Sequence, residues 1–110
     1  MQYSIHYYCE DVEAGVLALP KTLLARYFNL TDRMILAGAN LGEPHTKALG
    51  NGLFELRLKG AEGIARVFYC SQAGRRIVML HSFIKKTEKT PIAARRIAAA
   101  RLKDIQHAHP

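Results

Sequence analysis

Two arginines, Arg57 and Arg66, lie near the middles of two segments in which apolar side chains alternate with others. Each falls on the side opposite the most regular apolar stripe, so both project from one face if the segments pair as neighbouring strands. A guanidinium presents a planar fork of N–H groups that matches phosphate oxygens. Such groups can stabilise the extra charge that develops on phosphorus when an RNA strand is cut by its own 2′-hydroxyl.

Lysine and histidine side chains near these arginines could supply the remaining chemistry. Cleavage without metal needs a base for the 2′-hydroxyl proton and an acid for the leaving 5′-oxygen. A lysine among other cations has a lowered pKa and can serve in either role. Lys85 and Lys86 follow the third strand-like segment, whereas His45 and Lys47 precede the first. If the segments pair in order, these groups could surround one concave face.

A plainer interpretation stays open, in which both arginines are solvated strand residues paired with Glu55 or Glu62. The sequence contains no GxGxxG, P-loop or GxSxG motif. Its acidic residues do not pair in the pattern of a glycosidase or a metal nuclease. We predict no metal site and no cofactor, because the five histidines are scattered and neither of the two cysteines lies in a CxxC motif.

The net charge of +7 is concentrated in the second part of the sequence. Residues 1–46 carry three basic and five acidic side chains, whereas residues 47–110 carry 13 basic and four acidic ones. This asymmetry suggests a polyanionic partner such as RNA or DNA, although a basic, soluble surface would show the same pattern. Residues 1–110 suffice for one domain, and no apolar run approaches the ~20 residues that cross a bilayer. We therefore expect a cytoplasmic protein without a secretory signal or a membrane partner.

Hydrophobic periodicity predicts a small α/β domain with the order β-α-α-β-β-β-α. The expected elements are a strand at 2–8, a helix at 10–18, a second helix with Pro20 in its first turn and its end near Gly38, a loop at 39–52, strands at 53–59, 64–70 and 76–83, and a last helix that begins at Thr90 and Pro91. Short turns between the last three strands favour an antiparallel meander. We expect strand 2–8 to pair antiparallel with them, the first two helices to cover one face, and Arg95 and Arg96 to lie off the buried stripe of the last helix.

Three segments carry a combination of motifs that is more specific than any one alone. They are LGEPHTKALGNGLFELR (41–57), GIARVFYC (63–70) and IVMLHSFIKKTEKTP (77–91). In this combination the chain closely resembles the phage-derived, HigB-like branch of the RelE/ParE toxin superfamily, most strongly from Leu41 to Pro91. The resemblance implies a RelE-like microbial toxin fold with a small, mainly antiparallel sheet.

The resemblance also implies roles for individual residues. Arg57 and Arg66 match the arginines of RelE-like toxins, which implies that these two and Lys85 are catalytic. The RNA-binding residues that we predict are Lys47, Lys86, His45, Arg95 and Arg96. We expect the two arginines to lie near Lys85 or Lys86 with few strong carboxylate partners. RelE-like toxins often stack a tyrosine near the last helix on the substrate base. No tyrosine follows Tyr69 here, so Phe83 either stacks in its place or belongs to the core.

The function implied is that of a type II toxin, a ribosome-dependent mRNA endoribonuclease that acts by metal-independent attack of the 2′-hydroxyl. Its expected partners are a cognate helix-turn-helix antitoxin, mRNA and the ribosome. One alternative is a ParE-like toxin that inhibits a protein such as DNA gyrase and cuts nothing. Another is a nucleic-acid-binding regulator, which we disfavour because no helix presents base-reading side chains after a tight turn.

Overall fold

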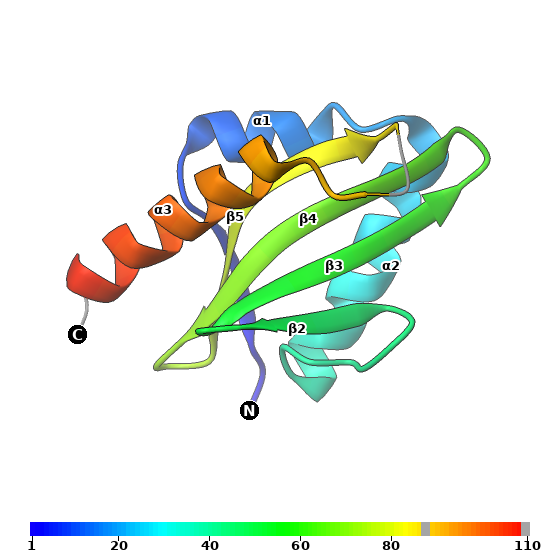
Figure 1. The fold of residues 1–110 in the computed structure, drawn as a ribbon. Coiled ribbons are helices and arrows are strands. Elements are labelled where there is room, and N and C mark those ends of the chain that lie inside the picture. Colours follow the sequence, from blue (N-terminus) through cyan, green and yellow to red (C-terminus); the bar gives the residue numbers. More distant parts are fainter. Residues whose placement is uncertain (87–88, 109–110) are drawn as a thin grey trace.

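The part of the chain that the computed structural model describes, residues 1–86 and 89–108, contains a five-stranded sheet in the order β1-β5-β4-β3-β2 (Figure 1). The elements are β1 (Ser4–Tyr7), α1 (Glu10–Leu17), α2 (Lys21–Ala37), β2 (Thr46–Gly50), β3 (Leu53–Gly60), β4 (Gly63–Gln72), β5 (Arg76–Lys85) and α3 (Ile92–Ala108). This arrangement confirms the predicted RelE-like α/β class with a mainly antiparallel sheet. Thr87 and Glu88, in the last sequence motif, lie outside the described residues.

The central strands β3, β4 and β5 form the predicted antiparallel meander. Both faces of this meander carry buried apolar side chains, because the meander lies in the middle of the sheet. Successive residues of each strand point to opposite faces. Leu56, Val67 and Met79 point to one face, whereas Phe68 and Leu80 point to the other. The meander therefore fixes which face each of its charged residues can occupy.

Two predictions about the edges of the sheet were wrong. The expected loop at 39–52 contains β2, which pairs antiparallel with β3. Asn51 and Gly52 connect these strands, and both have positive φ angles of 56° and 88°, as a tight two-residue hairpin turn requires. At the opposite edge, β1 pairs with β5 in parallel, with Ser4 beside Arg76, and not antiparallel as expected.

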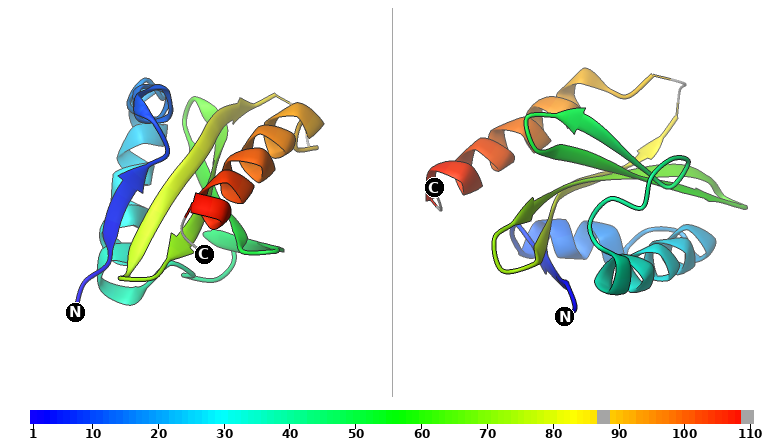
Figure 2. Two further views of the ribbon diagram at one scale, coloured as in Figure 1. Left: turned by 90° about the vertical axis from the view of Figure 1, so that its left-hand side faces the viewer. Right: turned by 90° about the horizontal axis from the view of Figure 1, so that it is seen from below.

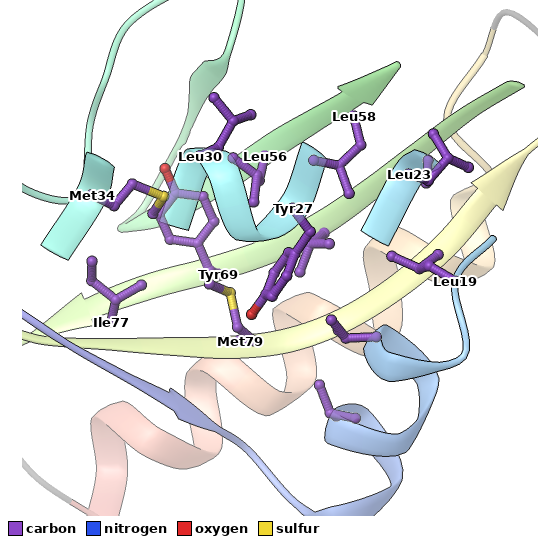
Figure 3. Packing of buried hydrophobic residues seen from close by; sticks show 14 residues of the cluster. Leu19, Leu23, Tyr27, Leu30, Met34, Leu56, Leu58, Tyr69, Ile77 and Met79 are labelled. Carbon is purple, nitrogen blue, oxygen red and sulfur yellow. The ribbon is translucent and has the colours of Figure 1, made fainter. Parts of the chain in front are cut away.

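Helices α1 and α2 cover one face of the sheet, as predicted, and α3 covers part of the other (Figure 2). Figure 3 shows the larger core, in which Tyr27 and Leu30 of α2 pack on Leu56, Leu58 and Tyr69 of the sheet. Because aromatic and aliphatic side chains fill the space under α2, this helix is held firmly against β3 and β4. Charged side chains at the margin of α2 are therefore held near the end of β3.

Helix α3 crosses the opposite face at one end of the sheet (Figure 1). Its buried residues Ala94, Ala98 and Leu102 belong to the cluster that contains Cys70 and Val78. The small alanines allow the helix backbone to approach the strands closely. The other end of this face, where β3 and β4 carry arginines, extends past the helix.

Candidate anion-binding site at the edge of strand β3

Arg57 and Arg66 are direct cross-strand neighbours on β3 and β4. Opposite residues of an antiparallel pair point to the same face, and this face is the one turned away from α1 and α2. Arg66 lies in turn opposite Phe83 of β5. The predicted strand phase of the two arginines is therefore confirmed.

A pocket of about 310 Å³ opens beside these arginines, next to the residues at which the edge strand β2 begins. The last backbone bond between the two segments runs from the Arg57 N–H to the His45 carbonyl, at 2.8 Å. Beyond it the edge of β3 faces the loop and α2. The pocket is lined by Arg26, Pro44, His45, Arg57, Leu58, Lys59, Ile64 and Arg66. Cationic side chains from α2, β3 and β4 thus converge on a space that suits a phosphate group.

The two arginines differ in their acidic partners. Arg66 Nε lies 2.8 Å from Glu55 Oε1, and these side chains are only 11% and 6% exposed. Arg57 Nη1 lies 3.6 Å from Glu43 Oε1, with exposures of 31% and 65%. The expectation of few strong carboxylate partners was therefore wrong for Arg66, because a guanidinium buried this deeply requires a counter-charge. Among the described residues, the acidic partner of Arg57 is an exposed and weak one, so Arg57 is the more available of the two.

Part of the hydrogen-bonding capacity of both guanidinium groups is unused. Within the described residues, Nε of Arg57 and Nε of Arg66 are buried and have no well-directed acceptor, although Glu55 lies at ion-pair distance from the second. Burial lowers the pKa of Arg66, Glu55 opposes this shift, and Arg57 adds to it. A buried N–H group without an acceptor is costly, so an oxyanion that reached Arg57 Nε would be bound favourably, whereas Glu55 already occupies the space beside Arg66 Nε.

His45 joins this site from the loop before β2. Its Nδ1 lies 3.2 Å from an Nη of Arg26, which belongs to α2. Burial lowers the pKa of His45, and Arg33 and Arg26 lower it further by charge repulsion. The histidine is therefore the least charged member of a cationic group.

The predicted lysines lie around the pocket and not in it. Lys85 is half-buried at the end of β5 opposite Ile64, diagonal to Arg66 on the same face. Lys86 is exposed just after the strand. Lys47 is exposed on β2, directly opposite Glu55. The three amines thus extend the cationic surface over β2 and β5.

Arg95 and Arg96 lie elsewhere, on the exposed side of α3. Arg95 donates a long hydrogen bond of 3.5 Å to the Leu49 carbonyl of β2. It lines a separate hollow of about 570 Å³ between α3 and the β2–β3 hairpin. The structure therefore does not bring these two residues together with Arg57 and Arg66.

Two cationic members of the pocket, Arg26 and Lys59, are not among the predicted site residues. Lys59 follows Arg57 by two positions on β3, so both side chains point to the same face of the sheet. The alternation of the strand alone could have identified Lys59. Arg26 precedes Tyr27 of the buried α2 stripe, which places it at the margin of the helix. That placement becomes useful only once α2 is known to lie beside the end of β3.

Phe83 is half-buried and contacts other aromatic rings. Its centroid lies 5.6 Å from that of Phe68 and 6.4 Å from that of His81. These contacts place Phe83 against the core under α3. The ring thus serves the core while lying beside Arg66.

The described part of the chain lacks the ligand cluster of a metal site and the long apolar helix of a membrane-spanning segment. No group of three or more His, Cys, Asp or Glu side chains there is arranged to hold a metal ion. Cys9 and Cys70 are free thiols. The described helices include none with the length and apolar character needed to span a membrane.

The free energy of unfolding is expected to fall as the pH drops from about 7 to about 5.5. Burial and nearby arginines lower the pKa of both His45 and His81 below the usual value of 6.5. The unfolded chain therefore binds more protons in this range, and acid favours it. Urea titrations at several pH values measure the slope, which should become shallower in His81→Gln. A free energy that is constant over this range would contradict the prediction.

Comparison with known proteins matches the sequence of this chain to one family model. Residues 15–103 match the family model described as "Phage derived protein Gp49-like (DUF891)". A search of curated proteins found no match. The family match covers most of the chain, including α2 and all of the strands that form the pocket. The chain therefore belongs to the Gp49-like family of phage-derived proteins, which is part of the RelE/ParE-like group of toxins.

Proposed function

We propose that this protein is the toxin of a type II toxin–antitoxin system and that it cuts mRNA on the ribosome. The observation that carries this proposal is the pocket at the edge of β3, where Arg26, Arg57 and Arg66 converge and where the buried Nε of Arg57 has no acceptor among the described residues. Membership of a toxin group supports the same function. A protein that only bound another protein would not need cations gathered in this way.

In this proposal Arg57 binds the scissile phosphate with its guanidinium fork and stabilises the charge that develops on it. Arg66, which Glu55 holds in place, acts as a fixed charge behind the same phosphate. Lys85 shuttles a proton at the end of β5. Lys47 and Lys86 contact neighbouring phosphates, and Arg95 and Arg96 contact RNA farther away on α3.

The remaining assignments follow from the same proposal. We place the chain in the HigB-like branch of the toxin group and in the cytoplasm, where it would meet mRNA and ribosomes. A cognate helix-turn-helix antitoxin would neutralise it. Binding to ribosomal RNA through the basic half would weaken steeply as the salt concentration rises.

The reaction consumes no water and needs no metal ion. The 2′-oxygen gives up its proton and bonds to the adjacent phosphorus, while the bond from phosphorus to the 5′-oxygen breaks and that oxygen gains a proton. We therefore expect mass spectrometry to find one product with a 2′,3′-cyclic phosphate and one with a 5′-hydroxyl. A 2′-deoxy substitution at the cut nucleotide should prevent cleavage. Products with 3′-hydroxyl and 5′-phosphate ends would contradict this chemistry.

The function itself is tested by inducing the protein and mapping the 5′ ends of one message in two forms. One form is translated, and the other lacks its ribosome-binding site and start codon. Codon-phased cuts that occur only in the translated form are the expected result. Intact messages together with DNA damage would favour the gyrase-inhibiting alternative and overturn the proposal.

A further inference from the structure

The contact between Arg26 and His45 determines where the imidazole carries its proton. An arginine side chain has only donors, so the 3.2 Å contact from its Nη to His45 Nδ1 requires Nδ1 to accept. An imidazole nitrogen that accepts a hydrogen bond is unprotonated. His45 is therefore neutral and carries its single proton on Nε2.

The surroundings of His45 oppose a second proton. Helix α2 contributes Arg26 and Arg33, both of which lower the pKa of this ring by repulsion. The strands contribute the three other cations of the pocket, which are Arg57, Lys59 and Arg66. The loop itself contributes one carboxylate, Glu43, which is exposed and lies 3.6 Å from Arg57. Positive charge therefore dominates on the helix and the strands that face the ring, and the loop adds one exposed carboxylate.

We propose that Arg26 is a positioning residue that holds His45 as a neutral hydrogen-bond donor, and that His45 uses its Nε2–H to bind a phosphate oxygen in the pocket. The ring then has no free lone pair, because Arg26 occupies the one on Nδ1 and a proton occupies Nε2. His45 is thus not the base that removes the 2′-hydroxyl proton. The consequence for RNA cleavage depends on the proposed function, whereas the protonation state and phosphate binding do not.

The proton position is tested by NMR of ¹⁵N-labelled histidine side chains, with a His45→Gln sample to assign the signals. We expect His45 to show the Nε2–H form and to titrate below the usual pH of about 6.5. Arg26→Ala should convert the ring to a mixture of both neutral forms and raise its pKa. Arg33→Ala is the matched control, since it removes a nearby charge but keeps the hydrogen bond, so the Nε2–H form should persist. A proton on Nδ1 in the unmodified protein, or an unchanged ring in Arg26→Ala, would overturn the inference.

Phosphate binding is tested by adding inorganic phosphate to the same samples. The His45 Nε2–H signal should shift on binding, and His45→Ala should weaken binding about tenfold. Glutamine places an N–H near the position of Nε2 but cannot accept a proton at neutral pH, so His45→Gln should retain most of the affinity. Equal loss in both variants, or no shift at Nε2–H, would contradict a donor role.

RNA cleavage separates this inference from the proposed function. If the protein cuts mRNA, His45→Gln should cleave faster than His45→Ala and should keep the pH profile of the original protein. Loss of cleavage in His45→Gln, together with normal phosphate binding, would identify His45 as a base and overturn the inference. If the protein cuts no RNA while the Nε2–H form and phosphate binding are observed, the proposed function fails and the assignment of His45 stands.

Discussion

Replacement of Arg57 by alanine is expected to slow mRNA cleavage about a hundredfold or more. One well-placed donor to a developing charge contributes roughly 3–4 kcal/mol to transition-state stabilisation in comparable sites. Arg57 is the more available arginine, because its side chain is 31% exposed and its partner Glu43 lies 3.6 Å away and is itself largely exposed. Single-turnover cleavage of a ribosome-bound message by purified protein measures the effect.

Two controls make this result specific to Arg57. Arg57→Lys should restore cleavage only in part, since an ammonium group has the charge without the fork. The free energy of unfolding of Arg57→Ala should change by less than about 1 kcal/mol, because exposed ion pairs contribute little. A folded Arg57→Ala protein that remains fully toxic to cells would show that Arg57 is not catalytic. If Arg66→Ala and Lys85→Ala were also fully toxic while folded, the nuclease proposal would fail.

Removal of Glu55 should produce the largest change in stability among the charged residues of the site. Glu55→Ala leaves the Arg66 guanidinium in a place where its side chain is only 11% exposed, without its counter-charge. Breaking one side of such a buried pair costs about 3 kcal/mol. For a domain of this size, a loss of that magnitude lowers Tm by more than about 10 °C.

The matched control is Glu43→Ala, which removes the exposed partner of Arg57 and should change the free energy of unfolding by less than about 1 kcal/mol. Urea unfolding of both variants gives the comparison. The double variant Glu55→Leu/Arg66→Met should be more stable than Glu55→Ala, because an apolar pair removes the unpaired charge. Equal stability of Glu55→Ala and the original protein would show that Arg66 is solvated there, as the plainer sequence-based interpretation had it.

Strands β3 and β4 could be predicted because each is long enough to show alternation on its own, and β5 because a run that is apolar on both faces is typical of an interior strand. Strand β2 could not, since its five residues include Gly50 and lie at an edge where three of them are exposed. The Asn51–Gly52 pair was nevertheless a usable signal, because this dipeptide favours a tight hairpin turn. The direction of β1 relative to β5 depends on the path of the whole chain between these two strands. No local sequence pattern predicts that path.

The site was predictable in the same partial way. Strand phase placed Arg57 and Arg66 on one face, but phase does not reveal which carboxylate a side chain will meet. Glu55 lies two positions before Arg57 and reaches diagonally to Arg66 on the next strand. Arg26 comes from a helix on the opposite side of the sheet. It reaches the pocket past the edge of β3, beside the residues that precede β2. Such contacts between distant segments depend on packing, which one sequence does not display.

The pairing of β1 with β5 also affects how the protein is made. During synthesis β1 emerges from the ribosome long before β5, so its strand partner is missing until β5 has been made. Pairing between such distant segments closes a long loop, which slows folding. Strand β5 also pairs with β4, which carries Arg66. The cationic pocket is therefore completed only after β5 has been made. Under the proposed function, the nascent toxin would be harmless to the ribosome that is making it until β5 has been translated and has paired with β4.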